Sequence, residues 1–421
     1  MQSEITIEQL YEMRPDGYLL VDIRDDAGYA YGSIPGAVHI PGAHLVKLLT
    51  GDTLPQQIVE SQADHIGVTK ETEDQNARDE RLRADLQAGK KLIVYCRKGE
   101  FSLDIAEHLT ERGVPAYSLK GGYQQWLLES ITKDISAEDG QQAVTSEDIE
   151  QSLRKKFRKS IWCKFTKAIN QYELVKEGDC IAVCISGGKD SMLMAKLFQE
   201  LKRHNKFAFE VKFLVMDPGY SPANRRIIEE NAKKLNIPIT IFESDIFESV
   251  FHVEKSPCYL CARMRRGHLY SKAKEMGCNK IALGHHYDDV IETILMGMLY
   301  GAQVQTMMPK LHSTNFPGME LIRPLYLVRE DDIKHWRDYN QLYFLQCACK
   351  FTETCSSCNA DGQSASKRLE VKHLIAQMKE TNPFVEGNIF KSVENVNLST
   401  VIAYKEHGVK HHFLDDYDVE S

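Results

Sequence analysis

Two series of alternating apolar and amphipathic segments constrain the fold of this chain more than any other feature of its sequence. The first series combines short apolar runs with a helical pattern, at 17–23, 92–96, 102–113 and 116–119. Parallel strands need a crossover connection, which is usually a helix, so this alternation predicts a parallel sheet covered on both faces. The polar segment 51–90 interrupts the series, and within it we expect a helix at 71–90 without evident chemistry.

The second series is longer and runs from about residue 150 to residue 301. Its helical patterns separate four expected strands, at 180–186, 209–217, 238–244 and 280–286. This order predicts an open, doubly wound α/β arrangement, in which ligands bind beyond the carboxyl ends of the strands. The expected parts of the chain are a first domain, a low-apolar linker, a second domain and a C-terminal extension, at 1–130, 131–150, 151–375 and 376–421.

The charge of the chain is unevenly distributed between its two halves. Residues 1–150 carry 27 acidic and 14 basic side chains, whereas residues 151–421 carry 33 and 38. This asymmetry indicates that only the second half meets a polyanion, although chance variation of solvated faces explains it equally well. No run of eighteen apolar residues and no signal-peptide pattern is present, so a cytoplasmic protein without membrane contact is expected.

A glycine-rich loop follows the first strand of the second series. Between an apolar strand that ends at Ile185 and a helix expected near Ser191 lie Ser186, Gly187, Gly188, Lys189 and Asp190. Glycines let main-chain N–H groups approach a phosphate, and the start of the helix offers its positive end to the same anion. Lys189 adds a cation. The pattern therefore predicts a phosphate site, against the alternative of a plain turn.

The loop is shorter than the P-loop of nucleoside triphosphatases, and "SGGKDS" resembles the PP-loop of the ATP pyrophosphatases. Those enzymes cleave ATP between its α and β phosphates and leave an adenylated substrate. The resemblance implies an ATP site at Ser186, Gly187, Gly188, Lys189, Asp190 and Ser191. An acidic group near the phosphates normally holds Mg²⁺, and Asp190 and Asp289 are the candidates.

Further motifs follow in a fixed order: "CYLC" at 258–261, "GHHYDDVIET" at 284–293, "RPLY" at 323–326 and "CSSC" at 355–358. Together with SGGKDS they closely resemble the tRNA 2-thiocytidine synthetase (TtcA) family. The resemblance implies that a cytidine of the tRNA anticodon loop is adenylated at its carbonyl oxygen and then attacked by sulfur, with AMP leaving. It also implies nucleotide contact by His285 and a catalytic role for Asp289; a plain acidic helix start is the alternative for the acids.

Members of this family carry a 4Fe–4S cluster on three cysteines, which leaves one iron open. The resemblance assigns Cys258 and Cys261 as two of these ligands. The third is expected at Cys358, with Cys355 and Cys349 as rivals, and the extra Cys347 departs from the family pattern. A zinc site is the alternative for two CxxC pairs, but Cys261 and Cys355 are 94 positions apart, far beyond a zinc-ribbon gap of roughly 15–20 residues. The remaining cysteines of this half are expected to be buried small residues: Cys163, Cys180, Cys184 and Cys278.

Cys96 ends an apolar strand and opens "CRKGEFS" before a helix. Main-chain N–H donors and the neighbouring Arg97 and Lys98 would stabilise a thiolate there. The loop resembles the active-site loop of rhodanese domains, whose cysteine carries a persulfide, and 21–41 and 119–126 match two other rhodanese segments. Many members have arginine where Phe101 stands, so thiosulfate-like oxyanions are poor candidate substrates. A buried cysteine in an inactive module is the alternative.

Basic residues interleaved with aromatics at 153–159, and "RMRR" at 263–266, suit contact with RNA, although such runs are more often solvated faces. The leading hypothesis is a two-domain sulfurtransferase in which Cys96 passes sulfur to an adenylated tRNA base. The alternatives are the same chemistry on uridine or on a non-tRNA metabolite, and a redox-responsive iron–sulfur protein. The expected partners are tRNA and an upstream donor of the cysteine desulfurase type; a homodimer is left open.

Overall fold

The structure is a computed structural model that describes residues 3–54, 73–136, 144–204, 207–244, 246, 257–345, 367–415 and 417. By internal contacts the chain divides into two compact units. The first contains 1–286 and 309–364, and the second contains 287–308 and 365–421. No helix among the described residues is long and apolar enough to span a bilayer.

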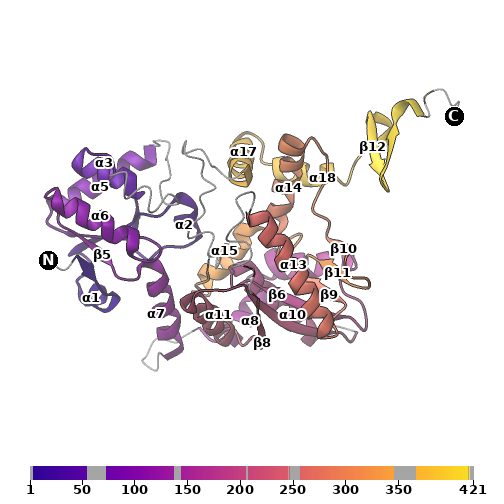
Figure 1. Ribbon diagram of the computed structural model, residues 1–421, viewed down its shortest axis with the longest axis horizontal. Helices are drawn as coiled ribbons and strands as arrows, with labels where there is room; N and C mark the ends of the chain where they lie inside the picture. The colour runs from indigo at the N-terminus through magenta and orange to yellow at the C-terminus, as the bar shows by residue number, and fades with distance from the viewer. Residues whose placement is uncertain are drawn as a thin grey trace. The chain divides into compact units, whose positions relative to one another are not determined.

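The N-terminal part of the first unit contains a five-stranded sheet within the described residues, in the order β1-β5-β4-β2-β3 (Figure 1). All its pairings are parallel. Its strands are β1 (Glu4–Ile5), β2 (Tyr18–Asp22), β3 (Val38–His39), β4 (Lys91–Tyr95) and β5 (Ala116–Leu119). Its helices are α1 (Ile7–Glu12), α2 (Asp26–Tyr31), α3 (Gly42–Thr50), α5 (Glu73–Gln87), α6 (Glu100–Glu111) and α7 (Gly122–Ser136).

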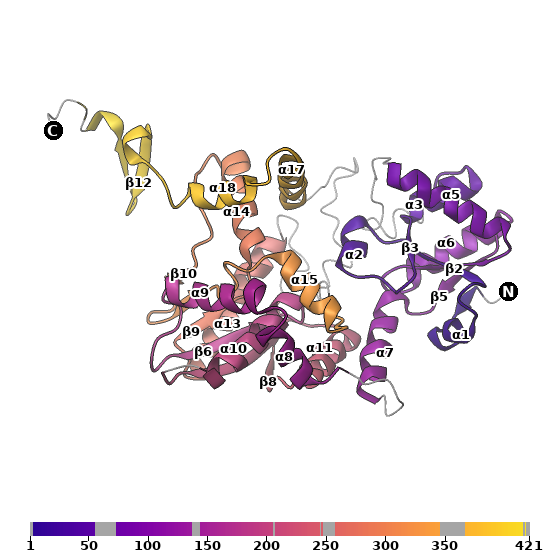
Figure 2. The same ribbon diagram turned by 180° about the vertical axis from the view of Figure 1, so that it is seen from behind.

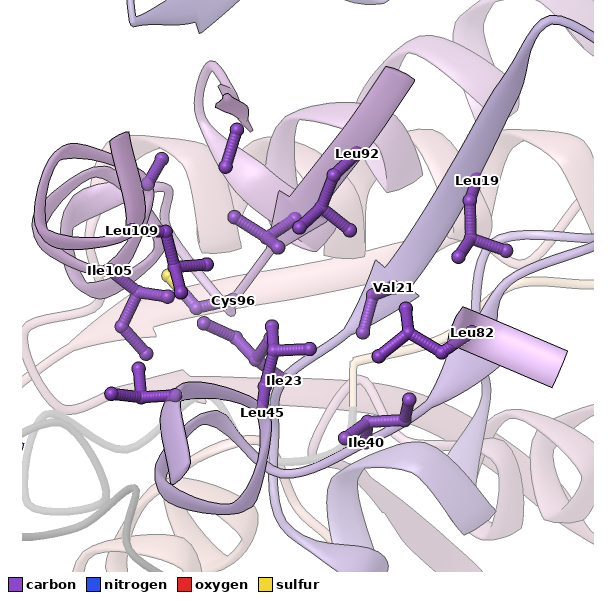
Figure 3. Packing of buried hydrophobic residues seen from close by; sticks show 14 of the residues in the cluster. Leu19, Val21, Ile23, Ile40, Leu45, Leu82, Leu92, Cys96, Ile105 and Leu109 are labelled. Atoms are coloured by element: carbon purple, nitrogen blue, oxygen red, sulfur yellow. The ribbon is translucent and has the colours of Figure 1, made fainter. Parts of the chain in front are cut away.

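Helices cover both faces of this sheet, as expected. Figures 1 and 2 show α3, α5 and α6 on one face and α1 and α7 on the other. Alternate strand residues such as Leu19, Val21 and Val94 pack with α3, α5 and α6 in one buried cluster. Figure 3 shows Cys96 at one end of that cluster, beside Ile105 and Leu109. The cysteine therefore lies where the sheet's carboxyl edge meets the start of α6.

The second sheet of the first unit has six strands among the described residues, in the order β10-β11-β9-β6-β7-β8. The strands are β6 (Cys180–Ile185), β7 (Glu210–Asp217), β8 (Ile239–Glu243), β9 (Lys280–Ala282), β10 (Lys310–His312) and β11 (Glu320–Ile322). Only β10 and β11 pair in antiparallel fashion among these described strands. The expected doubly wound α/β class is confirmed, and the edge strand β10 and its neighbour β11 are additions that the sequence did not predict.

The helices of this part are α8 (Ser146–Arg154), α9 (Cys163–Gln171), α10 (Lys189–His204), α11 (Pro222–Lys234), α13 (Pro257–Glu275) and α15 (Glu330–Tyr339). α13 packs on one face of the sheet, through Tyr270 and Ala273 against Ala182 and Cys184. α10 also packs on β6 and β7. A π-type turn, Arg158–Trp162, lies between α8 and α9.

The second unit contains α14 (Tyr287–Gly301), α17 (Lys367–Thr381), α18 (Val385–Ser392) and a hairpin of β12 (Ala403–Glu406) and β13 (Val409–His412). The Tyr287 ring stacks on Phe390 with centroids 4.5 Å apart, which joins α14 to α18. The hairpin turns through His407 and Gly408, and both have positive φ, as a two-residue type I′ turn requires.

The segment expected as a linker is partly helical at both ends. α7 continues to Ser136, and α8 begins at Ser146 behind a capping box formed by Thr145 and Asp148. Residues 137–143 lie outside the described residues. The boundaries of the four expected parts remain predictions.

Candidate active site

The glycine-rich loop joins β6 to α10 and occupies the carboxyl edge of the sheet. α10 begins at Lys189, two residues before the expected start, so the loop itself is only Ser186, Gly187 and Gly188. Gly187 has φ +87°, and a Cβ there would lie 2.6 Å from Cγ1 of Ile228 on α11. Backbone conformation and packing both require glycine at this position. The result is a tight turn that leads directly into the positive end of a helix.

The two serines of the loop close it on itself. The Ser186 main-chain N–H donates to Oγ of Ser191 at 3.2 Å, and the Ser191 hydroxyl donates to the Gly188 carbonyl at 3.0 Å. A Cβ on Gly284, after β9, would lie 3.3 Å from the Ser191 nitrogen. The structure thus brings the start of the "GHH" motif against the first turn of α10.

Lys189 is 4 % exposed and lies between two carboxylates. Its Nζ is 3.2 Å from Oδ2 of Asp190 and 3.3 Å from Oε1 of Glu330, the first residue of α15. Glu330 also pairs with Lys334 at 3.2 Å. Sequence reasoning missed Glu330; its only signal is the acidic start of a helix after the "RPLY" motif. The buried ammonium and the two acids form a site suited to a phosphate and a hard cation.

His286 lies beside this site. It is 7 % exposed, and its Nε2 lies 4.0 Å from Oδ1 of Asp190. The predicted nucleotide residue His285, its neighbour, is half-buried after β9. Asp289 belongs to the second unit, where Arg368 donates to its Oδ1 at 2.7 Å. Arg368 also lies 3.4 Å from Glu292, so it contacts two acidic residues of α14.

The turn at Gly187 allows a matched test within the same part of the chain. Gly178 also has positive φ, +81°, but a Cβ there would meet nothing within 4 Å. We expect Gly187→Ala to lower the rate of AMP formation from ATP about tenfold or more, because the Ile228 contact displaces the loop. Gly178→Ala should introduce only conformational strain, and its rate of AMP formation should equal that of the wild type. Equal rates for both variants would contradict this role of the turn.

Cys96 is 2 % exposed and follows β4. Its Sγ accepts hydrogen bonds from the Gly99 main-chain N–H at 3.1 Å, the Ser102 N–H at 3.4 Å and the Ser102 hydroxyl at 3.4 Å. Three donors directed at one sulfur suit a thiolate or a persulfide anion. A Cβ on Gly122 would lie 2.5 Å from the Cys96 carbonyl, so the closing segment of this part packs directly on the loop.

A buried ion pair fixes the segment between β2 and α2. Asp22 and Arg24 are 0 % and 6 % exposed, and Arg24 Nη2 lies 2.5 Å from Asp22 Oδ2. The Tyr95 hydroxyl donates to the same carboxylate at 2.8 Å and accepts from the Ile34 N–H at 3.1 Å. Burial raises the pKa of Tyr95, so this hydroxyl keeps its proton. The network positions α2 beside the strand that precedes Cys96.

The predicted cluster ligands are only partly within the described residues. Cys258 and Cys261 lie near the start of α13, about one helical turn apart, but their side chains are outside the description. Cys358 and its rivals Cys355 and Cys349, like Cys347, are outside it altogether. Elsewhere in the described part of the chain, no group of three or more histidine, cysteine or acidic side chains could hold a metal. The ligand set therefore remains a prediction.

The four cysteines expected to be buried divide into two groups. Cys184 and Cys278 are buried, and burial raises the pKa of the Cys184 thiol to about 12. Cys163 is exposed, so the prediction is wrong for this residue. Cys163 begins α9 after the π-type turn and lies outside the apolar face formed by Phe165 and Ile169. Cys180 is half-buried at the start of β6.

Exposed basic residues follow α8, continue into the π-type turn and recur on α13. Lys155, Lys156, Arg158 and Lys159 are exposed around the buried Phe157. Lys156 Nζ lies 3.6 Å from the centre of the Tyr339 ring. On α13, Arg263 and Arg266 are exposed. Cations beside an exposed aromatic ring can contact a phosphate backbone and stack a base.

Comparisons with known proteins agree with both α/β parts. Residues 6–129 match the model of the rhodanese-like domain, and residues 158–349 match that of the PP-loop domain. The tRNA-cytidine(32) 2-sulfurtransferase of Anaeromyxobacter dehalogenans is 33 % identical over 233 residues, which are 55 % of this chain and 77 % of the relative. That of Chromohalobacter salexigens is 33 % identical over 58 % of this chain and 82 % of its own length.

Among solved structures, the U34-tRNA thiolase NcsA from Methanococcus maripaludis, with its [4Fe-4S] cluster, matches with a TM-score of 0.45 and 22 % identity. The match covers 56 % of this chain and 78 % of that protein. The rhodanese-like and PP-loop folds expected from the sequence are thus confirmed by the family models.

Proposed function

We propose that this chain, which belongs to the tRNA-cytidine(32) 2-sulfurtransferase family, uses ATP to replace the oxygen of a tRNA nucleobase by sulfur. The base is an anticodon-loop cytidine, in keeping with the names of its relatives. The observation that carries the proposal is the SGGKDS loop, with Lys189 buried at the start of α10 between Asp190 and Glu330. Such a loop binds a polyphosphate by main-chain N–H groups, a helix end and one cation.

The proposed reaction has two steps, adenylation of the base and displacement of AMP by sulfide. The carbonyl oxygen of the base attacks the α phosphorus of ATP. The bond between the α phosphorus and the oxygen that bridges to the β phosphate breaks, and pyrophosphate leaves. A sulfide nucleophile then attacks the activated carbon, and the C–O bond breaks to release AMP. Lys189 and the N–H groups of the loop stabilise charge that develops on the phosphates. Asp190 and Asp289 remain the candidates for a Mg²⁺ ligand, and His285 would contact the nucleotide.

Sulfur reaches the base from the rhodanese-like domain in this proposal. Cys96 accepts a sulfur atom as a persulfide from a cysteine-desulfurase-type donor, and the donors around its Sγ favour the persulfide anion. Passing that sulfur on at the level of sulfide takes up two electrons, which a dithiol reductant supplies by forming a disulfide. Because both domains are in one chain, the carrier is present at high local concentration near the acceptor.

The donor set at the start of α13 fits an iron–sulfur cluster. Two cysteines one helical turn apart, at the positive end of a helix, favour the thiolate form that such clusters need. A 4Fe–4S cluster held by Cys258, Cys261 and a third cysteine, Cys358 by preference, would supply an open iron position for sulfide. The cysteine thiolates that hold the cluster would then position the sulfide next to the adenylated base.

The cluster assignment predicts which cysteine holds iron. We expect Cys258→Ser, purified without oxygen, to lose most of its iron and its absorbance near 400 nm. Cys163→Ser is the matched control, because Cys163 is an exposed free cysteine of the same domain and should keep the iron of the wild type. Iron retained in Cys258→Ser, or lost equally in both variants, would contradict the assignment.

The proposed reaction is tested by its products. With bulk tRNA, a persulfide donor and ATP under anaerobic conditions, we expect AMP and pyrophosphate in equal amounts and 2-thiocytidine in the digested tRNA. Release of ADP would contradict the activation step. Thiouridine instead of thiocytidine would assign the same chemistry to a different base, and a bound cluster without ATP turnover would indicate a redox sensor.

A further inference from the structure

A tyrosine of the rhodanese-like domain contacts the phosphate loop of the PP-loop domain. Both domains belong to the first compact unit, and Tyr31 is the last residue of α2. The main-chain N–H of Lys189 points at the Tyr31 hydroxyl oxygen, 3.4 Å away, and the hydroxyl donates to the Leu345 carbonyl at 2.6 Å. A Cβ on Gly188 would lie 3.7 Å from the same oxygen. The hydroxyl therefore lies directly over the turn that opens α10.

The chemistry of this contact resembles that of a bound phosphate. Toward the loop, the hydroxyl acts as an acceptor for the first N–H of α10, while its own proton is directed to Leu345. Burial raises the pKa of Tyr31, so the hydroxyl keeps the proton that this second bond needs. A phosphate oxygen is also an acceptor, and the N–H at the start of a helix is the donor it seeks. The hydroxyl and a phosphate therefore compete for one N–H group.

Other contacts hold Tyr31 in this place. Arg337 of α15 donates to the Tyr31 carbonyl, and the Lys189 ammonium lies 5.3 Å from the centre of the tyrosine ring. Away from the loop, Gln124 donates to Oδ1 of Asn224 at 2.7 Å, which joins α7 to α11. A cavity of about 270 Å³ borders Tyr31 and is lined in part by Ser33, Tyr123 and Phe344.

We propose that the Tyr31 hydroxyl and the phosphate of the nucleotide compete for the Lys189 N–H, and that this competition couples the two domains. This inference rests on the proposed ATP site. With the rhodanese-like domain docked, Tyr31 holds the N–H; with ATP bound, the phosphate takes it and the docking contact weakens. Linkage makes the effect reciprocal, so whatever strengthens docking weakens ATP binding by the same factor. Tyr31 is a positioning residue that sets the order of sulfur delivery and ATP activation.

The first test compares two tyrosines of the same helix. We expect Tyr31→Phe to bind a non-hydrolysable ATP analogue about three- to tenfold more tightly than the wild type in calorimetric titration, because one competing hydrogen bond is lost. Tyr29→Phe is the control: its hydroxyl donates to Ala37 within its own domain and should leave the affinity unchanged. Unchanged or weaker binding by Tyr31→Phe would overturn the proposal.

A second test fixes the docked arrangement covalently. The double variant Gln124→Cys with Asn224→Cys places two thiols on either side of an existing contact, and a short bis-maleimide should join them, as peptide mass analysis would verify. We expect the cross-linked form to bind the ATP analogue several-fold more weakly than the same variant without the cross-link, and this penalty to vanish when Tyr31→Phe is added. Equal affinity of the forms with and without the cross-link would overturn the coupling. If even the wild type binds no ATP analogue, the proposed function itself fails instead.

Discussion

Lys189→Ala should lower the rate of AMP and pyrophosphate formation by at least a hundredfold, and this is one of the two largest effects expected for this protein. The ammonium is 4 % exposed at the start of α10, where solvent cannot replace it and where charge on a phosphate would be least screened. Loss of one such electrostatic contact to a transition state typically costs about 10²–10³ in rate. Turnover is measured with radiolabelled ATP and tRNA.

The structure also provides the control for this variant. Lys202 lies on the same helix and is exposed in its last turn, so Lys202→Ala should keep the wild-type rate. Glu330 keeps Lys334 as its partner when Lys189 is removed, and the loop should therefore stay folded. Equal melting temperatures of the two variants would confirm this. A Lys189→Ala protein with normal turnover would refute the assignment of the loop as the ATP site.

Cys96→Ser should abolish sulfur transfer from a persulfide donor to tRNA while leaving ATP activation largely intact. A serine hydroxyl cannot carry the sulfur atom, and the proposed ATP site, the loop at 186–191, does not include Cys96. We expect at least a hundredfold loss of ³⁵S incorporation when labelled cysteine and a cysteine desulfurase supply the sulfur. Adding inorganic sulfide in excess should bypass the carrier and restore thiolation.

The bypass separates a carrier from a structural cysteine. If Cys96 only supported the buried cluster around Ile105 and Leu109, sulfide would not rescue the variant. Cys163→Ser, an exposed cysteine outside the relay, should keep full incorporation from either source. Normal transfer by Cys96→Ser from the persulfide donor would remove the rhodanese-like domain from the proposed pathway.

The sequence predicted the features that are local along the chain. The loop from Ser186 to Ser191 is one strand–turn–helix unit, so its glycines and hydroxyls could be interpreted without knowing the rest of the fold. The same holds for Cys96, whose hydrogen-bond donors all come from the next six residues. Short-range geometry of this kind is dictated by the residues that take part in it.

The contacts that the sequence did not reveal are those made between distant segments. Glu330 reaches Lys189 from a helix 141 positions away, and Tyr31 does so across 158 positions. Neither residue type marks its partner, because an acid at a helix start and a tyrosine at a helix end are common in any protein. The exposure of Cys163 was missed because the π-type turn at Arg158–Trp162 rotates the following helix out of the expected periodicity.

The central claim is that the oxygen of the nucleobase leaves as part of AMP, and it is tested most directly by isotope transfer. A substrate tRNA carrying ¹⁸O at the cytidine carbonyl is incubated anaerobically with the protein, ATP and a sulfur source, and the AMP is examined by mass spectrometry. The account predicts one ¹⁸O atom in the AMP phosphate for each 2-thiocytidine formed. Thiolated tRNA accompanied by AMP without the heavy isotope would contradict it.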